Sequence, residues 1–165
     1  MTEPAPPPAS PAEAHFRPAV AADVELLLGF MREFYAHEGL LFQEPAARAA
    51  VLGLLREPSA GRVFLIEVGG TPVGYAVLTL GYSLAYQGRD AFIDELFIGP
   101  SHRGRGLGRQ AVAFLVDTCR ALEVRALHLE VERVNAPAQR LYLSTGFEGH
   151  DRALLTKWIR RPEGT

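Results

Sequence analysis

The sequence predicts a mixed α/β domain, because stretches with strand character and stretches with helical periodicity follow one another along one chain. Three observations carry this prediction. An apolar helical face recurs near the N-terminus, a Gly-Gly hairpin joins two β-branched stretches, and a loop rich in Gly and Arg separates a strand from a helix. The length of 165 residues suits one domain with a core of its own.

The N-terminal part of the chain is expected to pass from a disordered tail into a strand and two helices. Residues 1–14 are mostly Pro and Ala, which cannot build a core, so the domain is placed at residues 15–165. A short strand is predicted over residues 15–17. Helices are predicted over residues 21–36 and 45–55, and the apolar face of the first comprises Val24, Leu27, Leu28, Met31 and Tyr35.

The middle of the chain reads as three strands. Residues 62–68 and 72–80 are apolar and β-branched, and Gly69-Gly70 between them is a hairpin turn. Residues 81–90 are polar and aromatic and predict a loop. A further strand is predicted over residues 91–98.

The C-terminal part alternates helices and strands. A helix is predicted from the Gly/Arg loop to about residue 122, followed by a strand over residues 125–131. The next helix spans residues 136–144, with Asn135 well placed as its N-cap. A last strand is predicted over residues 154–159.

Composition excludes several classes of function. The net charge of −2 gives no electrostatic reason to expect a nucleic acid or an anionic membrane as partner. The single cysteine, Cys119, permits no intramolecular disulfide and suits a reducing compartment, and the N-terminus shows no secretion signal, so the expected location is the cytoplasm. The five histidines lack paired spacing, so no metal site is expected.

The loop of residues 103–108 carries the first chemical signal. Backbone N–H groups of a Gly-rich loop at a helix N-terminus bind anions, and glycines let a diphosphate come close to the backbone. Arg103, Arg105 and Arg109 add positive charge around the loop. The pattern therefore predicts a site for a phosphorylated cofactor.

A dinucleotide-dependent oxidoreductase is one alternative for this loop. Gly106-x-Gly108-x-x-Ala111 fits the dinucleotide fingerprint in form, and Glu130 follows where an acid would bind the ribose. Against it, residues 99–103 separate the strand from the fingerprint, and the chain after Glu130 is too short for a doubly wound sheet.

Two segments resemble the GNAT superfamily of N-acyltransferases. Residues 93–115, IDELFIGPSHRGRGLGRQAVAFL, resemble its acetyl-CoA-binding segment, whose signature Arg/Gln-x-x-Gly-x-Gly/Ala is met by Arg103, Gly106 and Gly108. Residues 129–147, LEVERVNAPAQRLYLSTGF, resemble the second landmark of the family, a strand, an Asn, a helix with Leu-Tyr and then Gly-Phe.

The resemblance implies a central, mostly antiparallel sheet that splays at the cofactor site and is flanked by helices. It implies acetyl-CoA as cosubstrate, with the pantetheine arm against the strand that ends at Ile98 and the diphosphate on the Gly/Arg loop. The residues it assigns to the cofactor are Leu96, Phe97, Ile98, Arg103, Gly104, Arg105, Gly106, Leu107, Gly108, Arg109, Asn135 and Tyr142.

The resemblance also assigns catalytic roles. An alkyl amine with a pKa of about 10.4 must lose a proton before it attacks, at a cost of roughly 4–5 kcal/mol at pH 7, and a carboxylate can accept that proton. Glu95 or Asp94 serves this purpose; strand alternation directs only one of them toward the cleft, and we favour Glu95. Glu130 is a third candidate. The phenol of Tyr142 would hydrogen-bond or protonate the departing thiolate.

The predicted function is transfer of an acetyl group from acetyl-CoA directly to a primary amine, with a small molecule favoured as the acceptor. A protein or peptide N-acetyltransferase and a non-catalytic acyl-CoA-binding or sensor domain of the same fold remain alternatives. A homodimer is consistent with the resemblance. Candidates for the acceptor pocket are Phe34, Tyr35, His37, Glu38, Tyr82 and Tyr86.

Overall fold

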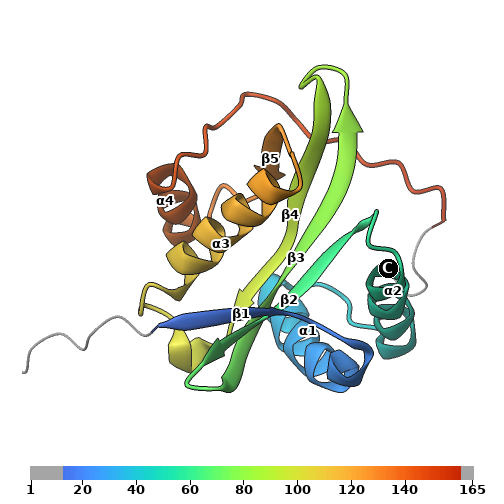
Figure 1. The fold of residues 1–165 in the computed structure, drawn as a ribbon, viewed down its shortest axis with the longest axis vertical. Coiled ribbons are helices and arrows are strands. Elements are labelled where there is room, and N and C mark those ends of the chain that lie inside the picture. The colour runs from blue at the N-terminus through green and yellow to red at the C-terminus, as the bar shows by residue number, and fades with distance from the viewer. Residues whose placement is uncertain (1–12, 161–165) are drawn as a thin grey trace, which may run out of the picture.

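Residues 13–160 are described by a computed structural model (Figure 1). Residues 1–12 of the predicted tail and the last five residues of the predicted domain lie outside this range, and Ala14 already belongs to the first strand. The described residues form a five-stranded sheet in the order β1-β2-β3-β4-β5. Its strands are β1 (Ala14–Pro18), β2 (Gly61–Val68), β3 (Thr71–Ser83), β4 (Gly88–Ile98) and β5 (Ala126–Leu129).

The sheet is mostly antiparallel, as predicted. The pairs from β1 to β4 are antiparallel, and only β4 and β5 run parallel among residues 13–160. One parallel pair at a sheet edge is not a doubly wound dinucleotide-binding sheet, so that alternative is wrong.

Helices cover both faces of the sheet (Figure 1). One face packs against the pair α1 and α2, and the other packs against α3, beside which α4 lies. The helical elements are η1 (Ala21–Asp23), α1 (Val24–Glu38), α2 (Glu44–Arg56), η2 (Pro100–His102), α3 (Leu107–Ala121) and α4 (Ala136–Ser144), where η marks a short 3-10 helix.

Strand alternation divides the core into two layers. In β3, Tyr75 and Val77 face α1 and α2, whereas Ala76 and Leu78 face α3. These residues are buried on both faces, as expected for a sheet covered by helices on each side. The predicted face of α1 is confirmed, because its four aliphatic residues Val24, Leu27, Leu28 and Met31 are all buried.

The turn between β3 and β4 is shorter than the sequence predicts. The expected loop over residues 81–90 is wrong at both ends, because pairing continues through Gly81 with Asp90 to Ser83 with Gly88. The polar and aromatic composition of this stretch reflects an exposed hairpin tip, where a strand needs no apolar side chains. Residues 84–87 make the turn, with Gln87 at a φ of 59°.

The predicted last strand, residues 154–159, is also wrong. The described chain after α4 contains no strand, and residues 148–160 are exposed. In Figure 1 this segment leaves α4 and crosses to the side where α2 lies. An extended segment becomes a strand only where it pairs with another, and this one does not return to the open edge of β5.

Candidate active site

An irregularity in β4 positions the two candidate carboxylates. Val77 of β3 pairs with Glu95 and Leu78 pairs with Ile93, so Asp94 is an extra residue in β4. Such a bulge interrupts the alternation of side chains. Ile93 packs in the layer that faces α3, whereas Asp94 and Glu95 both line a cavity on the other face. The prediction that alternation directs only one acid toward the cleft is therefore wrong.

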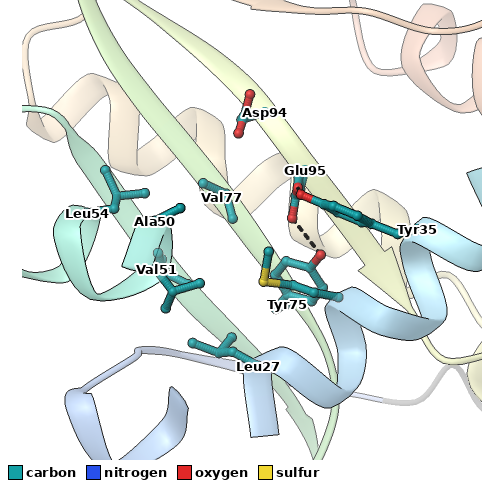
Figure 2. Close-up of a pocket in the computed structure, with 11 residues that line it drawn as sticks. Leu27, Tyr35, Ala50, Val51, Leu54, Tyr75, Val77, Asp94 and Glu95 are labelled. Carbon is teal, nitrogen blue, oxygen red and sulfur yellow. Dashed lines mark hydrogen bonds between the residues drawn. The ribbon is translucent and has the colours of Figure 1, made fainter. Parts of the chain in front are cut away.

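The cavity lies between the sheet and the two N-terminal helices (Figure 2). It has a volume of about 120 Å³, and its lining side chains come from α1, α2 and strands β2 to β4. Aliphatic side chains such as Leu27, Val51 and Leu54 form one end, and the carboxylates lie toward the other (Figure 2). The arrangement suits a ligand with one apolar end and one cationic end.

Glu95 is fixed by two tyrosines. The Tyr35 hydroxyl donates to Glu95 Oε1 at 2.7 Å, and the Tyr75 hydroxyl donates to Oε2 at 2.6 Å. Burial raises the pKa of Glu95 above its usual value, and the charge of Asp94 adds to this, while the two hydrogen bonds act in the opposite direction. The result is an oriented carboxylate that holds a proton more readily than an exposed one.

The tyrosines themselves remain proton donors. Burial, with the negative charge of Glu95 added, raises the pKa of both Tyr35 and Tyr75. Tyr35 was among the predicted pocket residues, whereas Tyr75 was missed. The sequence could have indicated it, because strand alternation puts the polar hydroxyl of Tyr75 on the same buried face as Val77 in an otherwise apolar stretch.

Asp94 occupies a different environment from Glu95. Its side chain is exposed, yet the protein around its carboxylate desolvates the group and raises its pKa. It lines the same cavity as Glu95 and is the more exposed of the two acids.

The backbone of β4 is open beside these acids. Pairing with β5 runs from Asp90–Ala126 to Ile93–Leu129 and then stops, while β4 continues to Ile98. Within residues 13–160, no strand pairs with β4 beyond Ile93 on this side. Free N–H and C=O groups on a strand edge can hydrogen-bond an extended ligand.

The three residues at the end of β4 that the resemblance assigns to the cofactor differ in their burial and in the face of the sheet on which they lie. Phe97 is 2% exposed, and its ring lies 6.0 Å from those of Phe30 and Phe34, so it can meet a cofactor only through its backbone. Leu96 and Ile98 are half-buried on the face toward α3.

The glycines of the Gly/Arg loop have separate roles. Gly104 and Gly106 adopt φ values of 74° and 79°, and an added Cβ at either would meet no atom within 4 Å. They supply backbone conformations that other residues rarely adopt, beside open space at the start of α3. A Cβ on Gly108 would instead lie 3.0 Å from Leu141 Cδ2, so this glycine allows α3 to approach α4. Leu107 is buried, which leaves its backbone for a ligand.

Two of the three arginines support the loop through internal contacts. Arg103 Nε donates to the Ile98 carbonyl oxygen at 2.9 Å, and its Cζ lies 5.6 Å from the centroid of Phe97. Arg109 Nη2 donates to Ser144 Oγ at 2.9 Å, which ties α3 to the end of α4. Arg105 is exposed. Their positive charges surround the helix N-terminus that would receive a diphosphate.

Helix α4 presents the remaining predicted residues. Asn135 Oδ1 accepts a hydrogen bond from the Ala138 amide at 3.2 Å, which confirms the predicted N-cap. Tyr142 is half-buried, with its ring centroid 5.7 Å from that of Phe147. Burial, and then the negative charge of Glu38 at the end of α1, raises the pKa of Tyr142. The phenol therefore stays protonated at neutral pH.

Several other candidates lie outside this constellation. Glu130 is exposed just after β5 and does not line the cavity. Tyr82 and Tyr86 lie near the β3–β4 turn, where the Tyr86 ring centroid is 4.8 Å from that of His128. Within residues 13–160, no three His, Cys, Asp or Glu side chains are grouped to hold a metal ion. None of the helices in that range has the length and apolar character to cross a bilayer.

Comparison with known proteins decides the family. Residues 25–147 match the model of the Acetyltransferase (GNAT) family. The chain belongs to this family. A putative [ribosomal protein bS18]-alanine N-acetyltransferase of Bacillus subtilis is 30% identical over 114 residues, which cover 69% of this chain and 72% of that protein.

Solved structures share the fold. An integron cassette protein from the mobile metagenome of Cole Harbour Salt Marsh is 39% identical, with a TM-score of 0.80 over 89% of this chain and 91% of its own. The aminoglycoside N-acetyltransferase AAC(6')-Iy in complex with CoA is 18% identical and has a TM-score of 0.76, covering 90% of this chain and 97% of its own. This GNAT chain is accordingly an acyltransferase that uses acetyl-CoA and acetylates an amine.

Proposed function

We propose that this enzyme moves the acetyl group of acetyl-CoA to the primary amine of a small molecule, with Glu95 as general base and Tyr142 as hydrogen-bond donor to the departing sulfur. One observation carries the proposal. The bulge at Asp94 lets two acidic residues line one cavity beside the part of β4 whose edge is unpaired.

The described residues fit acetyl-CoA in two ways. The edge of β4 from Asp94 to Phe97, which no strand of the described chain covers, offers backbone groups to the amides of a pantetheine arm, and Gly104 and Gly106 leave open space at the N-terminus of α3 for a diphosphate. Asn135 and Tyr142 would approach the same cofactor from α4. When bound, acetyl-CoA supplies an activated acetyl thioester.

Proton removal falls to Glu95. The acceptor amine arrives as an ammonium ion, with a pKa of about 10.4, and attacks only after it has lost a proton. A carboxylate whose pKa is raised accepts that proton better than an ordinary one, because its basicity lies closer to the working pH. The hydroxyls of Tyr35 and Tyr75 hold the carboxylate in place. Asp94 at the cavity mouth attracts the cation.

The bonds and protons that change in the reaction leave one role for Tyr142, that of proton donor to the departing sulfur. The ammonium loses two protons in all, and Glu95 passes the first to solvent before the attack. A bond then forms between the amine nitrogen and the acetyl carbon, the carbon–sulfur bond breaks, and the second nitrogen proton passes to Glu95. The sulfur leaves as a thiolate and needs a proton donor. Because the pKa of Tyr142 is raised, its hydroxyl is present as a donor at neutral pH.

The small, partly open cavity favours a small acceptor. The relatives differ in this respect, since the Bacillus subtilis protein is named for a ribosomal protein and AAC(6')-Iy for aminoglycosides. A volume of about 120 Å³ beneath α2 gives no room for a folded protein surface. A compact molecule can bring its amine to Glu95 from inside it.

Thiol release from acetyl-CoA tests the proposal against small primary amines and an N-terminal peptide. Wild type should release CoA only when a small amine is present, and Glu95→Gln should abolish most of this rate. Glu13→Gln is the matched control, because Glu13 is exposed at the opposite edge of the sheet. Turnover with the peptide alone, or equal rates in both variants, would refute the proposal.

A further inference from the structure

We propose that the acceptor is a compact monoamine whose apolar body, a short branched alkyl chain or one aromatic ring, occupies the cavity beneath α2. This inference rests on the proposed function, because it assumes that the amine reaches Glu95. It selects one substrate class, alkyl and aralkyl amines, over polyamines, aminoglycosides and peptides.

The walls of the cavity define the apolar end of the ligand. Leu27, Val51 and Val63 are all buried, and Leu54 and Met31 complete the aliphatic surface. Every polar side chain that lines the cavity comes from the pair of tyrosines and the pair of acids. A hydroxylated sugar ring or a peptide carbonyl placed against the aliphatic walls would lose its hydrogen bonds to water and gain none.

The charged end accommodates one cation. A carboxylate has about four lone-pair positions, and the two tyrosine hydroxyls use two of those on Glu95. The remaining positions can accept N–H groups from one ammonium ion, with Asp94 as a second negative charge at the mouth. A second ammonium that followed the apolar body past Glu95 into the cavity would lie among aliphatic side chains with no partner.

The size of the cavity sets the size of the apolar body. An apolar protein cavity of about 150 Å³ binds benzene. The volume of about 120 Å³ here therefore suits four to six carbon atoms. In Figure 2 the aliphatic side chains Leu27, Val51 and Leu54 lie away from Glu95. One ligand can therefore place its amine at Glu95 and its apolar body against these side chains at the same time.

Helix α2 offers a matched pair of variants. Ala50 lines the cavity although its side chain is exposed, so Ala50→Trp extends a ring over the cavity without overpacking the core. Ala49 is also exposed on α2 but does not line the cavity, and Ala49→Trp carries the same helix propensity. A difference in amine binding between the two variants is therefore due to the cavity and not to the stability of the helix.

The test measures amine binding by calorimetry in the presence of CoA, and kcat/KM by thiol release from acetyl-CoA. The amines are ethylamine, butylamine, 3-methylbutylamine and benzylamine, compared with spermidine, kanamycin and an alanine-terminated peptide. We expect kcat/KM to rise about fourfold for each methylene until the cavity is full. Ala50→Trp should weaken binding of benzylamine at least tenfold, and Ala49→Trp should leave it unchanged.

The outcomes separate the two proposals. If the apolar amines bind in an Ala50-dependent manner but none is acetylated, the assigned chemistry fails while the ligand class stands. If spermidine, kanamycin or the peptide is acetylated with the highest kcat/KM, or if Ala50→Trp binds benzylamine as wild type does, the proposed ligand class is overturned.

Discussion

Replacing Glu95 by Gln removes the proposed base and almost nothing else. The amide has the shape of the carboxylate, but it cannot accept the ammonium proton. General base catalysis contributes roughly 10²–10⁴-fold to rates. We therefore expect kcat to fall by at least 10²-fold, which corresponds to about 3 kcal/mol or more of lost transition-state stabilisation.

The fold should tolerate this change. Glutamine Oε1 still accepts from one tyrosine, and its amide can donate to the other once that hydroxyl rotates. Two charge-assisted hydrogen bonds become neutral ones, but a buried charge is also removed. These effects oppose each other, so the free energy of unfolding at pH 7 should change by no more than about 1 kcal/mol.

The pH dependence gives an independent check. Because the pKa of Glu95 is raised in the folded state, the stability it contributes is complete below its unfolded pKa and is lost as the pH rises through the folded pKa. Glu95→Gln should therefore gain stability relative to wild type as the pH rises above the unfolded pKa of about 4.3, measured by urea unfolding. In activity, the wild type should show an acid limb in kcat/KM that the variant lacks.

Thiol release from acetyl-CoA with a good amine measures kcat and the pH dependence of kcat/KM, and Asp94→Asn is the comparison. Asp94 is exposed at the mouth, so its loss should raise KM for the amine about tenfold or less and leave most of kcat. The reasoning is refuted if Glu95→Gln keeps the kcat of wild type and its acid limb, or if Asp94→Asn loses kcat in its place.

Three further predictions concern α4, the cofactor loop and the thiol. Tyr142→Phe should lower kcat about 10²-fold at unchanged KM for acetyl-CoA, because its ring still packs on Phe147; an unchanged kcat would exclude the role as donor. Gly106→Ala forces a side chain into a φ of 79° and should cost about 1–2 kcal/mol of stability by chemical unfolding, whereas Gly53→Ala, exposed within α2, should stabilise by about 0.5–1 kcal/mol. Burial raises the pKa of Cys119 to about 11, so the native protein should react with Ellman's reagent only after unfolding, and prompt native labelling would contradict this.

Local signals were read correctly from the sequence. The helical spacing of α1, the N-cap at Asn135 and the Gly69-Gly70 turn each depend on neighbouring residues, and all are confirmed. Both turn glycines have positive φ values, as a two-residue hairpin of type I′ requires. The pairing of β2 with β3 across this turn is confirmed as well.

Features that depend on pairing between distant parts of the chain could not be predicted from the sequence. Residues 154–159 have strand composition, but composition does not say whether an edge is within reach. The bulge at Asp94 arises from the register between β3 and β4, and without it the two acids were expected on opposite faces. Tyr75 was missed for the same reason, because its partner Glu95 lies on another strand. The two acids and Tyr35 were thus named from the sequence, but the other residues that surround them could be identified only from the sheet.

The most direct measurement is the stoichiometry of one reaction. Wild-type protein, acetyl-CoA and 3-methylbutylamine are mixed, and free CoA and N-acetylated amine are quantified together by mass spectrometry. Direct transfer predicts one acetylated amine for each CoA released, no CoA release without the amine, and no acetylated protein. CoA release that continues without the amine, or an amine that stays unmodified while the protein gains an acetyl group, would contradict the assignment of this cavity as the site of amine acetylation.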